Sequence, residues 1–309
     1  MNVSGGPSGH SLRDALLAAR ARIEASAANA APGSCETPYL DAVILLSDAT
    51  GYPKERLLAS LSEPLIASHA ARFESLVRAR CSGRPISYLL GRKEFYGRTF
   101  AVSEATLVPR PETELLVELA LSLLDGIDGA TDAPHLHDCC TGSGCIAITI
   151  KAERPNTVVS ASDISASALE VALANARSLL ADDAIRFEQG SDLEALGALG
   201  REGLEPPIIV TANPPYLTDN EYAALAACNW PEPRVALEAG PDGLSVIRTL
   251  ATQAARHVAP SGWLITEIGA TQAGRVSEIL YEAGFAEISI HQDLSGRDRA
   301  CMARLASAS

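Results

Sequence analysis

The chain has 309 residues, a formal net charge of −13 at neutral pH, 47% hydrophobic residues and 20% charged residues. This length allows one large domain and a smaller one, and the composition is that of an ordinary globular protein. Proteins that grip a long phosphate backbone usually carry a basic stripe, because counterion release supplies much of their affinity. Stable nucleic-acid binding is therefore not expected. The densest basic cluster is interpreted as a solvated rim and comprises Arg78, Arg80, Arg84, Arg92 and Lys93.

The cysteines point to neither disulfides nor a metal. Their number is odd, and no Cys-x-x-Cys pair is matched by a second one. Cys139, Cys140 and Cys145 lie close to His135 and His137, but this spacing matches no zinc pattern, so no metal is expected. Reduced thiols favour a cytoplasmic protein. No signal-peptide pattern and no apolar run near about eighteen residues is present, so no membrane association is expected.

Residues 11–84 are predicted to form a small all-helical domain, after a flexible, glycine-rich tail at residues 1–10. Within residues 66–80, for example, Phe73 and Val77 fall on one face of a helix. By itself this domain indicates no function.

A β-hairpin is predicted in the linker formed by residues 85–110, because Phe95 and Phe100 flank a glycine-containing turn. Pro111 then stands where helices often begin, and residues 112–124 are predicted to be helical with acidic residues in the first turn.

Residues 111–309 are predicted to form a Rossmann-like α/β domain, because strands and helices alternate from about residue 134 onward. Strands are expected at residues 136–138, 157–162, 185–188, 208–211, 263–267, 287–291 and 300–305. Helices are expected at residues 145–154, 166–180, 244–258 and 270–282. This pattern predicts a seven-stranded parallel sheet with helices on both faces. Ligands bind outside the carboxyl ends of such strands, so the chemistry should follow the first, second and fourth strands.

A nucleoside-binding turn is predicted after the first strand, in Cys140-Thr141-Gly142-Ser143-Gly144. Its glycines allow the backbone to turn sharply beside a ligand, and Ala147 completes a Gly-x-Gly-x-x-Ala pattern. Asp163 ends the second strand, where a carboxylate can accept hydrogen bonds from both ribose hydroxyls. The pattern fits NAD as well as S-adenosylmethionine, and an ordinary strand–helix turn with a capping acid is the alternative.

The fourth strand ends in Asn213-Pro214-Pro215-Tyr216, which we interpret as the catalytic corner. Neither proline can donate to a sheet, so the strand must stop and leave acceptors at its edge. The Asn213 oxygen and the Pro214 carbonyl could hold both N–H groups of a planar NH₂ and aim its nitrogen at an electrophile. This suits methyl transfer from S-adenosylmethionine to an amide or adenine nitrogen, whereas hydride transfer to NAD has no use for it. An ordinary strand-ending loop is the alternative reading.

With these motifs the chain resembles the glutamine methyltransferases that modify peptide chain release factors, also called protein-(glutamine-N5) methyltransferases. The resemblance spans about residues 40–305, and the shared runs are residues 84–89, 107–114, 141–147, 213–216, 232–237, 267–269 and 293–299. Asn-Pro-Pro-Tyr alone is shared with adenine and other amino methyltransferases. The runs at 109–114 and 293–299 are more selective.

The resemblance implies a helical domain that recognises the release factor and a catalytic domain that methylates the glutamine of its Gly-Gly-Gln loop. S-adenosylmethionine is the implied cofactor. On that analogy the turn from Cys140 to Gly144 lies along its methionine portion, Asp163 binds its ribose and Leu193 lies against its adenine. Asn213 and the Pro214 carbonyl would hold the glutamine amide.

Two positions depart from the family pattern. Cys140 stands where the family usually has glycine, so the backbone there must avoid positive φ or accept strain. Cysteine at this position also resembles the branch that methylates a glutamine of a large-subunit ribosomal protein. Leu193 replaces a residue that is often aromatic. The runs at 109–114 and 293–299 favour the release-factor branch.

Two rival functions remain open on the sequence. A nucleic-acid amino methyltransferase could use the same corner, but it must flip a base out and normally needs a basic surface. A non-catalytic nucleoside-binding adaptor of ribosomal factors is the second rival, and the intact corner at residues 213–216 argues against it.

Overall fold

The structure is a computed structural model that describes residues 11–27, 37–127, 133–181, 184–191, 195–197 and 203–306. The predicted tail at residues 1–10 and the predicted adenine neighbour Leu193 lie outside the described residues. The chain divides into two compact units. The helical unit comprises Met1–Gly91 with Ala224–Pro231, and the sheet unit comprises Arg92–Ala223 with Glu232–Ser309.

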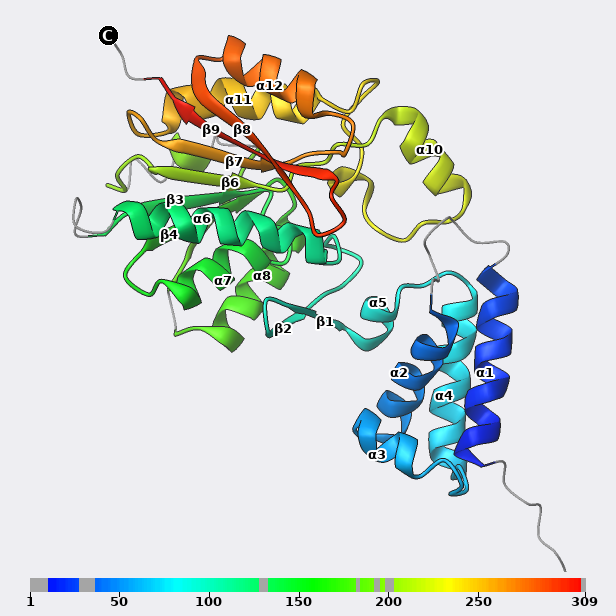
Figure 1. Cartoon of the computed structure of the whole chain (residues 1–309). Coiled ribbons are helices and arrows are strands. Elements are labelled where there is room, and N and C mark those ends of the chain that lie inside the picture. Colours follow the sequence, from blue (N-terminus) through cyan, green and yellow to red (C-terminus); the bar gives the residue numbers. More distant parts are fainter. Residues whose placement is uncertain are drawn as a thin grey trace, which may run out of the picture. The chain divides into compact units, whose positions relative to one another are not determined.

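The helical unit is built from α1 (Leu12–Ala27), α2 (Pro38–Thr50), α3 (Lys54–Ala59), α4 (Ala67–Cys81) and α5 (Ile86–Leu90) (Figure 1). Helices α1, α2 and α4 pack against one another around a core that includes Leu16, Leu45 and Phe73. This confirms the prediction of helical structure. The interpretation of Arg80 as part of a solvated rim is wrong, because its side chain is only 6% exposed and its Nε lies 2.8 Å from Asp41 Oδ2 in a buried ion pair.

The sheet unit begins with a hairpin of β1 (Arg92–Phe95) and β2 (Arg98–Ala101), followed by a seven-stranded sheet. The sheet strands are β3 (His135–Cys139), β4 (Val158–Asp163), β5 (Arg186–Gln189), β6 (Ile209–Ala212), β7 (Trp263–Glu267), β8 (Phe285–Gln292) and β9 (Asp298–Leu305). Their order is β5-β4-β3-β6-β7-β9-β8 (Figure 1). Each of the seven predicted strands overlaps one of these, and the seven-stranded fold is confirmed.

The strand order brings three loops to one edge of the sheet. β3 lies between β4 and β6 and is parallel to both, with Asp138 opposite Ala161 on one side and Thr211 on the other. The chain runs outward from β3 to β5 and then returns to β6 on the other side of β3. Ligands of α/β sheets bind at such a reversal, beyond the carboxyl ends of the strands.

The prediction of a wholly parallel sheet is wrong for the last strand. β9 is antiparallel to both β7 and β8. Between β8 and β9 the Asp293 N–H donates to Arg297 O at 2.9 Å, and Asp293 Oδ1 accepts from Ser295 N at 2.9 Å. A turn this short joins antiparallel neighbours, because a parallel connection needs a crossover of a dozen or more residues.

Helices cover both faces of the sheet, as predicted (Figure 1). One face carries α6 (Glu114–Ile127), which follows the 3₁₀ turn η1 (Pro111–Thr113), together with α7 (Cys145–Glu153) and α8 (Ala166–Leu179). The other carries α11 (Ser245–His257) and α12 (Ala273–Glu282). Helix α10 (Asp219–Ala227) and the 3₁₀ turn η2 (Arg234–Ala236) lie between β6 and α11 in the chain. Within the described segments, every helix is too short or too polar to cross a bilayer.

Candidate active site

The turn between β3 and α7 is shaped by two glycines with positive φ, +56° at Gly142 and +79° at Gly144. A Cβ atom at Gly144 would lie 2.8 Å from Ile148 Cδ1, so a side chain there would require a shift as well as a strained backbone. The Thr141 N–H donates to Ser162 O at 3.0 Å, which ties the turn to β4. The backbone of this turn therefore forms one wall of a cavity.

The sequence left open whether Cys140 avoids a positive φ or accepts backbone strain, and the structure shows a positive φ. Its φ is +56°, in the left-handed region that glycine prefers. For a residue with a Cβ atom this conformation costs roughly 1–2 kcal/mol. The thiol lies beside that of Cys139, with the two sulfur atoms 3.9 Å apart.

Asp163 ends β4 and holds the turn between β3 and α7 from the neighbouring strand. Its Oδ2 accepts from Gly142 N and its Oδ1 from Ser165 N, both at 2.9 Å. Burial raises the pKa of Asp163, while these backbone N–H groups lower it. Ile164 follows and is 55% exposed on the cavity wall, which the sequence interpretation missed. The available signal was an apolar residue immediately after the acid that ends the second predicted strand.

Asp138 is a second buried carboxyl group, to which the sequence analysis assigned no role. Thr141 Oγ1 donates to its Oδ2 at 2.6 Å, and Thr211 Oγ1 donates to its Oδ1 at 2.7 Å. Burial raises the pKa of Asp138 to about 7, although both hydroxyl donors act to lower it. The side chain joins the turn between β3 and α7 to β6, the strand that leads into residues 213–216.

Asn213 follows β6 directly, and its side chain is held by hydrogen bonds. Its Nδ2 donates to Thr113 Oγ1 at 3.2 Å, and Thr113 Oγ1 donates in turn to Glu267 Oε2 at 2.7 Å. Among the described residues nothing donates to Asn213 Oδ1. The amide is therefore oriented with its nitrogen toward η1 and its oxygen available as an acceptor.

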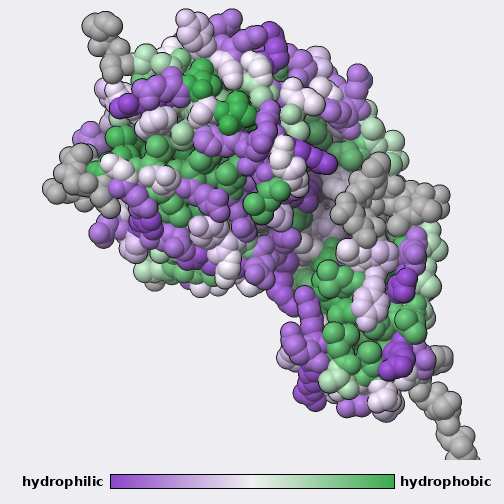
Figure 2. Space-filling view, viewed as in Figure 1, coloured by the Kyte–Doolittle hydropathy of each residue, from purple (hydrophilic) through white to green (hydrophobic). Residues whose placement is uncertain are grey.

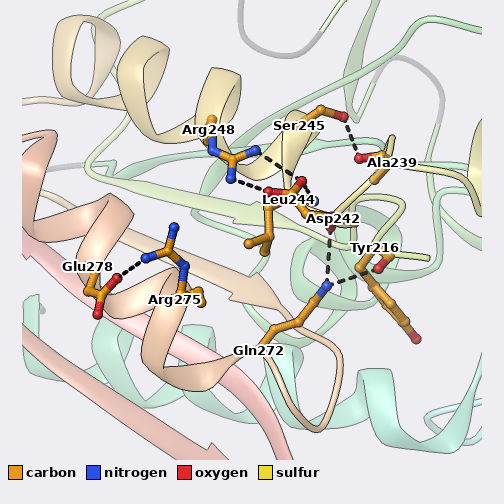
Figure 3. Close-up of polar contacts among 10 residues, drawn as sticks. Tyr216, Ala239, Asp242, Leu244, Ser245, Arg248, Gln272, Arg275 and Glu278 are labelled. Atoms are coloured by element: carbon orange, nitrogen blue, oxygen red, sulfur yellow. Dashed lines mark hydrogen bonds and ion pairs between the residues drawn. The ribbon is translucent and has the colours of Figure 1, made fainter. Parts of the chain in front are cut away.

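Tyr216 is anchored through both its hydroxyl and its backbone. The hydroxyl donates to Glu267 Oε1 at 3.3 Å, and burial together with the Glu267 charge raises the pKa of Tyr216. Its backbone carbonyl accepts from Gln272 Nε2 at 3.0 Å, and Figure 3 shows Gln272 reaching toward Tyr216. Gln272 also donates to Gly243 O at 3.2 Å and accepts from Gly269 N at 2.9 Å, so one amide joins three loops. No sequence signal identified it.

The segment before η1 is fixed by a buried carboxylate. Glu232 Oε1 accepts from Val108 N at 3.1 Å, and Glu232 Oε2 pairs with Arg110 Nη2 at 2.5 Å. Two of the family-like runs, at residues 107–114 and 232–237, therefore meet at this ion pair.

A cavity of about 510 Å³ brings the predicted site residues together. Of the described residues assigned from sequence, those lining it are Cys140, Thr141, Gly142, Ser143, Asp163, Asn213 and Pro215, whereas Gly144, Pro214 and Tyr216 do not. Thr113 and residues 105–107 also contribute to its wall. Asn213 and the Gly142 turn thus face one space.

The chemistry of this wall fits S-adenosylmethionine. The Asp163 carboxylate accepts hydrogen bonds from backbone N–H groups, among them those of Gly142 and Ser165, and keeps lone pairs for ribose hydroxyls. Ser143 Oγ is buried on the cavity wall, and the Cys145 thiol is its hydrogen-bonding neighbour there. A thiol is a weak partner, so a polar group of a ligand would satisfy this hydroxyl better.

The strand order and a cavity shared by a nucleoside turn and an acceptor corner place the chain in the class of Rossmann-like methyltransferases. Solved structures support the fold. The hMettl16 catalytic domain is 14% identical, with a TM-score of 0.52 over 78% of this chain and 82% of that one. The human methyltransferase 10 domain containing protein has a TM-score of 0.51 at 15% identity, over 69% of this chain and 90% of that one.

Sequence relatives narrow the class. The family described as the PrmC N-terminal domain matches residues 15–91. A release factor glutamine methyltransferase of Burkholderia pseudomallei is 41% identical over 86% of this chain and 92% of its own length. One of Cereibacter sphaeroides is 38% identical over 96% and 99%. The chain belongs to the release factor glutamine methyltransferase family.

Proposed function

We propose that this chain transfers the methyl group of S-adenosylmethionine to the side-chain amide nitrogen of the glutamine in the Gly-Gly-Gln motif of peptide chain release factors. Relatives that carry the name of this activity match nearly the whole chain. The observation that carries the proposal is the hydrogen bond from Asn213 Nδ2 to Thr113, which leaves Asn213 Oδ1 as an acceptor at the cavity.

In the proposed reaction Asn213 Oδ1 and the Pro214 carbonyl accept the two N–H groups of the glutamine amide. The amide nitrogen is planar and its lone pair is delocalised, so its orientation matters more than a strong base. When bound, S-adenosylmethionine supplies an electrophilic methyl group on a sulfonium. Pro215 stiffens the corner and Tyr216 remains a neutral phenol beside it. Asn213 therefore acts by positioning the acceptor and removes no proton. The amide nitrogen becomes cationic and acidic on methylation, so it would release its proton to water without a strong base.

The proposed cofactor contacts come from three loops. The backbone and side chains along the methionine portion would be those of Cys140, Thr141, Gly142, Ser143 and Gly144. Asp163 would hold the ribose hydroxyls, with Leu193 beside the adenine.

We further propose the division of labour along the chain. Residues 11–84 would recognise the release factor, and residues 111–309 would carry out the methyl transfer. Residues 85–110 would link these two domains. The protein partner is the release factor, which implies a cytoplasmic location. The net charge of −13 disfavours a nucleic-acid substrate.

The test is incubation of the enzyme and S-adenosylmethionine with a release factor, with large-subunit ribosomal protein and with nucleic acid, in separate reactions. Mass spectrometry of the release factor should find one added methyl group, located on the glutamine of Gly-Gly-Gln. Methylation of only the ribosomal protein or only the nucleic acid would reject the substrate assignment.

Asn213→Ala tests the acceptor corner. Loss of one pre-positioned hydrogen-bonding group at a reacting centre typically lowers turnover by roughly a hundredfold or more. We expect such a loss in kcat, with the affinity for S-adenosylhomocysteine within a few-fold of wild type, measured by calorimetry. Unchanged turnover would show that Asn213 does not hold the amide.

A further inference from the structure

Glu267, at the end of β7, is the meeting point of several motifs that the proposed function leaves without a role. Its carboxylate is only 1% exposed. It accepts from the hydroxyl of Thr113, in the run at 109–114, and from that of Tyr216, in the acceptor corner. Burying a carboxylate is expensive, so a buried one with two aligned donors is expected to serve a purpose beyond stability.

Arg299, near the start of β9, supplies the balancing charge. Its guanidinium is largely buried, donates from Nη1 to Ile268 O at 3.4 Å and lies 3.3 Å from Asp293 through Nε. Burial raises the pKa of Glu267, while the Thr113 hydroxyl and the positive charge of Arg299 lower it. Arg299, in the run at 293–299, therefore opposes the effect of burial on the pKa of Glu267.

Both Glu267 oxygens accept hydrogen bonds, Oε2 from Thr113 and Oε1 from Tyr216, and this sets the direction of the hydrogen-bond chain that reaches the active site. Thr113 must use its single hydroxyl proton toward Glu267. Toward Asn213 it can then only accept, so the amide must turn its NH₂ group to Thr113. The Asn213 oxygen is left facing the position of the acceptor.

We propose that Glu267 and Thr113 are positioning residues that determine which way the Asn213 amide faces. The proposal deepens the proposed function and rests on it for the identity of the acceptor, but the direction of the amide can be measured without any substrate. A flipped amide would present N–H groups to the N–H groups of the acceptor, and two donors cannot pair.

Three substitutions separate this role from packing. Thr113→Val keeps the shape and removes the hydroxyl, whereas Thr113→Ser keeps the hydroxyl. Glu267→Gln places an NH₂ group where an acceptor stood, so that Thr113 can accept from it and donate to Asn213 Oδ1 instead. We expect Thr113→Val and Glu267→Gln each to lower kcat by roughly 10- to 100-fold, because misalignment of a reacting group costs about that much. Thr113→Ser should remain near wild type.

Other parameters distinguish positioning from general damage. The affinity for S-adenosylhomocysteine and the KM for the protein substrate should stay within about threefold, and the double variant should lose no more than the worse single variant, because both act through one chain. Thr149→Val is the matched control. Thr149 Oγ1 is also buried and has no partner among the described residues, so its removal should leave kcat unchanged.

Neutron diffraction of the wild-type crystal reads the amide directly, and the deuterated nitrogen of Asn213 should face Thr113. An oxygen facing Thr113 would overturn the proposal. So would Thr113→Val within threefold of wild type, or Thr113→Ser as impaired as Thr113→Val. These rates are measured on whichever acceptor the wild type methylates. Absence of release factor methylation therefore rejects the proposed function, whereas the positioning of Asn213 by Glu267 and Thr113 is still tested on the other acceptor.

Discussion

Asp163 joins two parts of the site, because its carboxylate holds the Gly142 turn and offers its remaining lone pairs to the cavity. We expect Asp163→Ala to weaken S-adenosylhomocysteine binding at least about tenfold, equivalent to about 1.4 kcal/mol. Isothermal titration calorimetry provides the measurement. Glu170→Ala is a suitable control, since Glu170 is an exposed acid on α8 nearby. Equal affinities for wild type and Asp163→Ala would end the ribose assignment.

Individual side chains differ in how far the sequence identified them. Asn213, Asp163 and the Gly142 turn carry recognisable spacing, and the structure brings them to one cavity. Thr113 and Glu267 stood in family-like runs, but nothing in those runs indicated that they bond to each other across the fold. Gln272 had no signal at all, because its three partners are backbone groups, which any residue type could supply.

At the scale of secondary-structure elements, the side-chain amide of Asn175 in α8 joins several backbone segments, as that of Gln272 does. It is buried, its Oδ1 accepts from Ala101 N at 2.7 Å, and its Nδ2 donates to Ala101 O and to Ser143 O, both at 2.9 Å. One amide thus attaches the end of β2 and the turn between β3 and α7 to α8. Asn175→Ala leaves these groups without partners, and each buried one costs about 1–3 kcal/mol.

We therefore expect Asn175→Ala to lower the free energy of unfolding by about that amount and to weaken S-adenosylhomocysteine binding as the turn loosens. Denaturant titration and calorimetry measure the two effects. Leu173→Ala, at an exposed position of the same helix, should change neither by much. Full cofactor affinity in Asn175→Ala would mean that Ser143 needs no support from α8.

Helices and strands could be predicted from the sequence where they have a regular pattern of buried apolar residues, and they were missed where they have none. All seven strands were located, because six of them carry buried positions within a short run and β5 directly follows the buried Ile185. The direction of β9 was not, since strand periodicity is the same for both directions and the tight turn at Asp293 decides it. Helix α10 has no buried residue, so it lacks the apolar face by which a helix is recognised.

At the level of the entire molecule, we propose that the helical unit recognises the release factor. Its visible face gathers apolar side chains among polar ones (Figure 2). Tyr39 and Leu40, 43% and 45% exposed, line a shallow depression with Arg20. The double substitution Tyr39→Ser/Leu40→Ser should raise the KM for whole release factor several-fold, because a protein interface depends on a few anchoring side chains.

Turnover of a short Gly-Gly-Gln peptide should be the same in this double variant as in wild type, because we expect so short a peptide to make few contacts outside the catalytic cavity. Tyr281→Ser removes an exposed aromatic side chain from α12 and serves as the control. Equal KM values for whole release factor in both variants and wild type would assign recognition to another surface.

The stability of the sheet unit should depend on pH through a ladder of buried histidines. Glu205 O can only accept, so His135 Nδ1 donates to it at 2.6 Å, and His135 Nε2 accepts from Ser160 Oγ at 2.7 Å. Ser160 Oγ then accepts from His137 Nδ1 at 2.8 Å, and His137 Nε2 accepts from Ser162 Oγ at 2.9 Å. Every group is satisfied when both rings are neutral.

Burial lowers the pKa of His137 to about 3, below its ordinary value of 6.5, and the neighbouring His135 adds to the effect. Below pH 6.5, His137 is therefore protonated in the unfolded chain but stays neutral in the folded chain. The free energy of unfolding consequently decreases as pH falls from 6.5 toward 3. Between pH 7.5 and 5.0 this group alone should remove about 2 kcal/mol from the free energy of unfolding. Asp138 acts in the opposite direction, since burial raises its pKa to about 7 and protonation favours its folded state.

His137→Asn isolates the histidine contribution, because Asp138 is present in both proteins. The variant should be less stable than wild type at pH 7.5, owing to lost hydrogen bonds, yet it should lose about 2 kcal/mol less on going to pH 5.0. Urea titrations of the full chain give the free energy of unfolding of both proteins at the two pH values. Comparing the loss between pH 7.5 and 5.0 in the two proteins cancels the cost of the substitution itself. Parallel losses in the two proteins would mean that His137 is protonated in the folded state and that the ladder tolerates a charge.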